Sequence, residues 1–157
     1  MPSAKLKEYL DSENIKYVSI IHSRAYTAQE TAESAHIPGK ELAKTVMVKL
    51  DGELAMAVLP ASERVDFDLL RGAANATKAD LADEREFNAL FPESEVGAMP
   101  PFGNLYGMDV YVEESLSEDS EISFNAGSHS ELIKLSYTDF ERLVNPKIVR
   151  ISSRYSS

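Results

Sequence analysis

The chain has 157 residues, of which 43% are hydrophobic and 27% charged, with a formal net charge of −10 at pH 7 and no cysteine. These values fit one soluble domain with a sizeable core, and they exclude disulfides, a thiolate nucleophile and cysteine-bound metals. No apolar run approaches the roughly 18 residues of a membrane span, so we expect no membrane partner. The acidic balance argues against extensive nucleic-acid binding, because phosphate contacts require basic surface.

The first forty residues predict a helix, a strand and a second helix. Ser3 can cap a short first helix, and the apolar run over 15–22 predicts a strand. Thr27-Ala28-Gln29-Glu30 matches the capping-box pattern, which predicts a helix over 28–35. Charged residues interrupt the opening segment, so we expect no secretory signal and a cytoplasmic location.

The clearest local signal is a β-hairpin. Two apolar runs, 44–50 and 53–59, are joined by Asp51-Gly52, a dipeptide that suits the positive φ angles of a type I′ turn. A two-residue turn places Lys44 opposite Leu59, on a largely apolar face of the hairpin. The Lys44 ammonium therefore lies either at the rim of a pocket or extended toward solvent.

The remaining sequence predicts both helices and strands. A Gly- and Pro-rich loop covers 95–106, and the acidic segment 113–121 is interpreted as a solvated turn. No repeat or linker interrupts the chain, so residues 1–157 are interpreted as a single compact α+β domain with a mixed sheet. Helices are expected over 66–74, 81–90 and 138–144, and strands over 108–112, 122–125, 131–135 and 148–151.

Two loops carry residues suited to ligand binding. In Gly97-Ala98-Met99-Pro100-Pro101-Phe102-Gly103, two prolines fix the backbone and the glycines permit close approach of a ligand. Such a loop can present N–H groups to a carbonyl oxygen, or it can be a tight connection that packs Phe102 into the core. In Asn125–Ser130, His129 is expected to be exposed and to titrate near neutrality, or to be incidental, as are His22 and His36.

Several familiar site patterns are absent. The sequence contains no phosphate-binding Gly-x-x-x-x-Gly-Lys-Ser/Thr, no Gly-x-Gly-x-x-Gly, no His-Glu-x-x-His and no Gly-x-Ser-x-Gly. Three scattered histidines do not match a zinc site, and the acidic segment lacks calcium-loop spacing. We therefore expect neither a metal nor a cofactor.

Taken together and in order, these motifs resemble one family. They are similar to the opening motif, the Gly-x-x-Pro-Pro-Phe-Gly loop and the final Gly-Ser-His motif of YbaK/EbsC proteins, and the resemblance extends over about residues 15–150. The segments concerned are His22, Tyr26–Glu30, Ala43–Lys49, Gly97–Gly103 and Phe124–His129.

The resemblance implies a fold and an activity. The family is similar to the editing domain inserted in bacterial prolyl-tRNA synthetases, and its members are mostly freestanding aminoacyl-tRNA deacylases that act in trans. It implies a compact α+β domain whose mixed, curved sheet is flanked by helices. It also implies a hydrolase for translation fidelity, whose partners are the acceptor end of a mischarged tRNA and, where the acidic surface cannot hold the tRNA, an aminoacyl-tRNA synthetase.

The same resemblance suggests a set of site residues. Lys44 takes the place of the family's key lysine, Gly97 lies in the loop that holds the aminoacyl group, and His129 lies near the pocket. Our mechanistic hypothesis is water attack on the ester, with N–H groups near Gly97 or Gly127 holding the carbonyl oxygen. The expected substrate-binding residues are His22, Tyr26, Thr27, Thr45, Pro100, Pro101, Phe102, Gly103, Gly127 and Ser128.

Two other functions remain open at this stage. The same pocket could bind an aminoacyl or nucleotide-like ligand without chemistry, or the domain could serve as an interaction module with an acidic surface. For a deacylase, alanine, serine, threonine and cysteine are all compatible as the amino acid removed.

Overall fold

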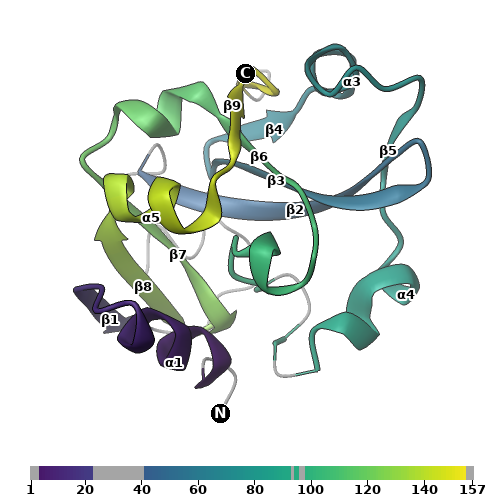
Figure 1. Ribbon diagram of the computed structural model, residues 1–157. Coiled ribbons are helices and arrows are strands. Elements are labelled where there is room, and N and C mark those ends of the chain that lie inside the picture. The colour runs from purple at the N-terminus through teal and green to yellow at the C-terminus, as the bar shows by residue number, and fades with distance from the viewer. Residues whose placement is uncertain (1–3, 23–40, 93, 96–97, 155–157) are drawn as a thin grey trace.

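The computed structural model describes residues 4–22, 41–92, 94–95 and 98–154. An eight-stranded mixed sheet dominates it, in the order β1-β8-β7-β2-β3-β6-β9, with β5 pairing with β2 beside this path (Figure 1). β4 and β10 form a separate two-stranded sheet. The strands are β1 Tyr17–Ile21, β2 Leu42–Leu50, β3 Glu53–Pro60, β4 Glu63–Val65, β5 Ala79–Leu81, β6 Val110–Glu113, β7 Glu121–Ser128, β8 Glu131–Ser136, β9 Lys147–Val149 and β10 Ser152–Arg154.

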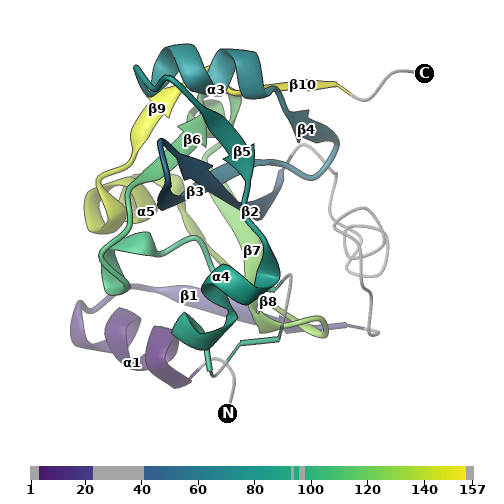
Figure 2. The ribbon, with the colours of Figure 1, turned by 90° about the vertical axis from the view of Figure 1, so that its right-hand side faces the viewer.

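Helices lie on both faces of the curled sheet, as two perpendicular views show (Figures 1 and 2). One core cluster joins side chains of α1, α4 and α5 to one face, around Phe102, Phe124 and Phe140. A second cluster packs Leu70 of α3 against the other face. The helices are α1 Ala4–Ser12, α3 Phe67–Ala73, α4 Glu84–Phe87 and α5 Tyr137–Val144, with 3-10 turns at Asn88–Leu90, Gly103–Leu105 and Glu114–Glu118.

The predicted hairpin is confirmed in its register. Lys44 lies opposite Leu59, and Asp51 and Gly52 have φ angles of 51° and 88°, as a type I′ turn requires. The Asp51 carboxylate also accepts hydrogen bonds from the N–H groups of Thr77 and Lys78, at 3.0 and 2.8 Å. The turn is thereby fixed to the segment that leads into β5.

Other predicted elements agree in type but differ in extent. The single helix expected over 81–90 is wrong, because β5 pairs with β2 through Leu81 and a new helix, α4, begins after Asp83. Asp83 and Glu86 form a capping box there, which sets the start of that helix. β7 continues to Ser128, so the expected loop from Asn125 is mostly strand. The helix predicted over 28–35 lies outside the described residues.

The acidic segment 113–121 is not wholly solvated, because Glu113 is only 5% exposed. Its Oε1 accepts hydrogen bonds from the N–H groups of Ile151 and Ser152, at 2.8 and 2.9 Å. The Ser152 hydroxyl lies 2.9 Å from the same oxygen and 2.6 Å from Oε1 of Glu63. Glu113 therefore holds the C-terminal strand against β4 and β6.

Replacing Glu113 with alanine should destabilise the fold. The substitution leaves two backbone N–H groups buried without their acceptor, and we expect a loss of about 3 kcal/mol in the free energy of unfolding. Urea denaturation measures it, with Glu114→Ala as the control because Glu114 is the exposed neighbour. Equal stability of the two variants would contradict this account of the C-terminal strand.

Candidate functional site

The two faces of β2 separate Lys44 from Thr45. Lys44 shares its face with Leu42 and lies opposite Leu59, which is fully buried. Thr45 lies opposite Val58, on the face that builds the main core. Lys44 is itself partly buried, so it is not simply extended into solvent. The two residues that the sequence grouped in one site thus point in opposite directions.

The contact between β2 and β7 determines what lies beside Lys44. The two strands run parallel and pair Leu42 with Ser123 and Ala43 with Phe124. The pairing ends there. One residue beyond the last pair, Lys44 and Asn125 hold corresponding register positions and share the face opposite Phe124. Asn125 is a residue that the sequence analysis did not single out.

A small buried apolar cluster lies beside these two polar side chains. Leu42, Ala61 and Leu132 form a small buried cluster of their own, with Ile20 of β1 packed against it. Leu132 lies opposite Asn125 across the β7–β8 pair. Lys44 and Asn125 therefore lie next to a buried apolar cluster, where electrostatic and hydrogen-bonding interactions are stronger than in water.

Immediately after Asn125, the end of β7 turns toward the loop that follows α4. The pairing with β8 is irregular between Asn125 and Ser128, and Gly127 has a φ of 94°. The Gly127 carbonyl accepts from the Glu95 N–H at 2.8 Å, and the Gly127 N–H donates to the Ala98 carbonyl at 2.9 Å. The structure thus joins the two loops that the sequence predicted to work together. It also commits the Gly127 N–H to Ala98, so this N–H cannot hold a substrate oxygen as we had expected.

The turn between β7 and β8 gathers His22, Ser128 and His129. The His22 N–H donates to the Ser130 carbonyl at 2.9 Å, and the Ser128 and Ser130 hydroxyls lie 3.3 Å apart. The expectation that His129 is exposed is wrong, because its exposed fraction is 6%. Its N–H donates to Oε1 of Glu95 at 2.7 Å, which holds the turn against the same loop as Gly127.

The Pro-Pro-Phe-Gly segment is part of the core. Pro100, Pro101 and Gly103 are buried and Phe102 is 0% exposed. The Phe102 ring packs against Phe124 and Phe140 at centroid distances of 5.4 and 5.6 Å. The structure therefore packs Phe102 into the core, as one of the two interpretations of this loop expected.

The remaining predicted residues lie outside the described part of the chain. These are Gly97, Tyr26, Thr27 and, among the histidines, His36. Within the described part, Lys44 is brought level with Asn125, two residues before the Gly127 bend, and His22, Ser128 and His129 lie at the turn that follows. Thr45 and the Phe102 segment are directed elsewhere.

A comparison of the sequence with family models identifies the family of the chain. Residues 22–143 match the model of the aminoacyl-tRNA editing domain, which is more than half of the chain. The chain belongs to the aminoacyl-tRNA editing domain family. Among curated proteins, none matches it.

Solved structures share the fold of this editing domain over nearly its whole length. One, described as hypothetical protein APE2540, is 19% identical with a TM-score of 0.84, and the match covers 95% of this chain and 99% of that one. Another, described as a candidate trans-editing enzyme for prolyl tRNA synthetase, is 16% identical with a TM-score of 0.82 and 97% coverage of both chains. A third, a candidate signal transduction protein from Marinobacter aquaeolei VT8, is 14% identical with a TM-score of 0.73, and the match covers 94% of this chain but 30% of that one. At these identities the likeness establishes the fold.

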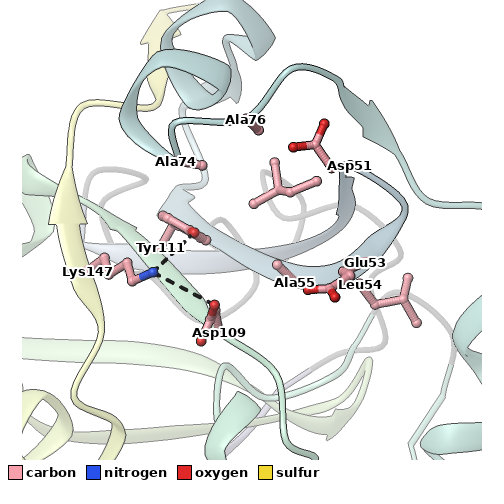
Figure 3. A pocket seen from close by; sticks show the side chains of 10 residues that line it. Asp51, Glu53, Leu54, Ala55, Ala74, Ala76, Asp109, Tyr111 and Lys147 are labelled. Atoms are coloured by element: carbon pink, nitrogen blue, oxygen red, sulfur yellow. Dashed lines mark hydrogen bonds and ion pairs between the residues drawn. The ribbon is translucent and has the colours of Figure 1, made fainter.

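A separate cavity of about 380 Å³ lies at the other end of the editing domain's hairpin (Figure 3). Asp51, Glu53, Asp109, Tyr111 and Lys147 line it. The Lys147 Nζ lies 3.4 Å from the Tyr111 hydroxyl and 3.8 Å from Oδ2 of Asp109, and these contacts raise the pKa of Lys147. Leu50 is the residue of β2 that lines this cavity, and it lies six residues, about 20 Å of strand, beyond Lys44. The cavity is therefore not part of the site described above.

Two further observations concern the described residues alone. No three His, Asp or Glu side chains gather among them in a way that could hold a metal ion. Within the same residues, no helix has the length and apolar character that crossing a bilayer requires.

Adding a methyl group at Gly103 should destabilise the editing domain. A Cβ there would lie 2.7 Å from Cγ2 of Val110 and 2.8 Å from the Met108 carbonyl oxygen, both closer than van der Waals contact allows. We expect Gly103→Ala to lose about 1–3 kcal/mol.

The matched control is Gly72→Ala, at an exposed position of helix α3. No atom lies within 4 Å of the added Cβ there, so this change should be neutral or stabilise by up to about 1 kcal/mol. Thermal denaturation of both variants measures the difference, and an unchanged midpoint for Gly103→Ala would refute a packing role for this glycine.

Proposed function

We propose that this editing domain hydrolyses the ester between a wrongly attached amino acid and the 3′ end of a tRNA, acting in trans. The observation that carries the proposal is the position of Lys44, in a chain of this family. Lys44 lies partly buried on β2, beside a buried apolar cluster. Its register position corresponds to that of Asn125 on β7, two residues before the bend at Gly127.

A separate hydrolytic site meets a physical need. A synthetase pocket gains only about 1–3 kcal/mol from one methylene, so binding alone does not reject a slightly smaller amino acid. A second site that accepts the wrong product and cleaves its ester provides the missing discrimination.

The reaction requires positioning more than a strong nucleophile, because an aminoacyl ester is already reactive. In the proposed step, a water oxygen attacks the ester carbonyl carbon and the carbonyl oxygen becomes an oxyanion. The bond from that carbon to the ribose oxygen then breaks, and the ribose oxygen takes a proton from the attacking water. The products are a free amino acid and a tRNA with its 3′ hydroxyl restored.

We assign Lys44 to the binding of the terminal phosphate or the ribose end of the substrate. A cation beside an apolar surface attracts a phosphate more strongly than one in bulk water. Since the Gly127 N–H is committed to Ala98, we propose that donors to the oxyanion come from the backbone around Gly97. We propose that His129 lies beside the bound substrate, because its backbone N–H fixes the β7–β8 turn to Glu95.

The acidic surface implies that the protein contacts few phosphates. Several described cations are already paired with carboxylates, including Lys7 with Glu131 at 2.7 Å and Arg71 with Asp68 at 2.8 Å. We therefore propose that the domain contacts the single-stranded acceptor end, and that a synthetase can hold the rest of the tRNA.

The dependence of the rate on salt tests this limited contact. Each phosphate contacted in a single strand contributes a slope of about −0.7 to a plot of log affinity against log salt concentration. For one or two phosphates, kcat/KM for deacylation should show a slope of about −1 between 50 and 200 mM salt. A slope steeper than about −4 would instead indicate an extensive tRNA-binding surface.

Removal of the Lys44 ammonium tests the proposed activity most simply. We expect Lys44→Ala to lower kcat/KM by about 10²–10³-fold while leaving the circular dichroism spectrum unchanged, because its side chain lies outside the main core. A panel of tRNAs mischarged with alanine, serine, threonine and cysteine provides the substrates.

The control is Lys49→Ala, on the same strand but the opposite face, where Lys49 pairs with Glu86 at 2.8 Å. It should retain wild-type rates. Near-normal rates for Lys44→Ala would disprove the assignment of Lys44. If the wild-type protein binds the esters but hydrolyses none of them, the domain is a binding module.

A further inference from the structure

The site contains a buried acceptor that the described protein does not satisfy. Asn125 lies on β7, on the face that it shares with Ser123, and opposite Leu132 of β8. Its Oδ1 atom is buried and has no hydrogen-bond partner among the described residues. Buried polar atoms in folded proteins are nearly always paired, so an exception calls for an explanation.

The missing bond has an energetic cost. A buried acceptor without a donor destabilises a protein by about 1–3 kcal/mol, whereas an apolar side chain of similar size avoids the penalty. Asn125 sits beside the fully buried Leu132, where a leucine or valine would suit the surroundings better. A ligand that brings a donor to Oδ1 would recover this energy on binding.

The position of Asn125 relative to Lys44 indicates which donor fits. The phosphate and carbonyl oxygens of an aminoacyl-adenosine end only accept hydrogen bonds, and the Lys44 ammonium can donate to them. The α-ammonium of the amino acid only donates, and it needs an acceptor. The Asn125 amide oxygen is such an acceptor.

We propose that Asn125 Oδ1 accepts a hydrogen bond from the α-ammonium group of the aminoacyl ester. This inference rests on the proposed deacylase function and deepens it. Lys44 and Asn125, level on neighbouring strands, then bind opposite ends of the reacting group. Asn125 distinguishes aminoacyl esters from acyl esters that lack a free amino group.

A cycle that combines a protein change with a substrate change tests the contact. Wild type and Asn125→Ala are each assayed on the aminoacyl-tRNA that the wild type hydrolyses fastest and on its deamino analogue, for example alanyl-tRNA and propionyl-tRNA. Because the intrinsic reactivities of the two esters cancel in the cycle, only the coupling between Asn125 and the amino group remains.

We expect Asn125→Ala to lower kcat/KM at least tenfold on the aminoacyl ester and at most twofold on the deamino ester. Equal losses on both esters, or no loss on either, would overturn the role of Asn125 while leaving the deacylase function in place. A wild-type protein that hydrolyses no member of the panel would instead refute the proposed function itself.

Stability measurements separate a ligand contact from a structural one. Asn125→Leu should unfold at the same or a higher urea concentration than wild type, because the unpaired acceptor is removed. The control is Asn104→Ala, since Asn104 Nδ2 donates to the Tyr9 hydroxyl at 3.1 Å and to the Leu143 carbonyl at 3.3 Å. That control should lose stability and affect both esters equally, and a large loss of stability in Asn125→Leu would show that Asn125 supports the fold instead.

Discussion

The short parallel contact between β2 and β7 is the constraint on which the site depends. It joins the antiparallel strands β1, β8 and β7 to the strands on the other side of β2. Only Leu42–Ala43 and Ser123–Phe124 form it, and Phe124 anchors it in the main core. The pairing stops there, and the next residue on each strand, Lys44 on β2 and Asn125 on β7, lies on the face opposite Phe124. A one-residue slip would turn Lys44 to the other face.

The Gly-x-x-Pro-Pro-Phe-Gly segment has a packing role in the structure. The Phe102 segment fills the core, and Gly103 is required by the closeness of Val110. Ala98 lies just before that buried segment in the chain, and its carbonyl accepts a hydrogen bond from the Gly127 N–H. A rigid core piece thus holds the bend that follows Asn125.

The features that could be predicted from the sequence are those that depend on neighbouring residues, such as the register of the hairpin. The Asp51-Gly52 turn fixes the hairpin register, so the position of Lys44 opposite Leu59 followed from counting residues. Asn125 could not be found this way, because its neighbour across the sheet lies about eighty residues away and long-range parallel pairing leaves no local pattern. The buried His129 donates its N–H to Glu95, and the buried Glu113 accepts from the Ser152 N–H. Both partners are distant in sequence, so a Gly/Ser-rich or acidic segment looked exposed.

The central claim is that substrate binds on the face shared by Lys44 and Asn125. NMR tests this claim directly. The ¹⁵N-labelled protein is titrated with 3′-alanylamino-3′-deoxyadenosine, an amide-linked analogue that an esterase does not hydrolyse. The account predicts that the amide signals of Lys44, Asn125 and Gly127 shift, while those of Asp51 and Lys147 at the far cavity stay in place. Shifts confined to Asp51 and Lys147, or none at saturating analogue, would contradict it.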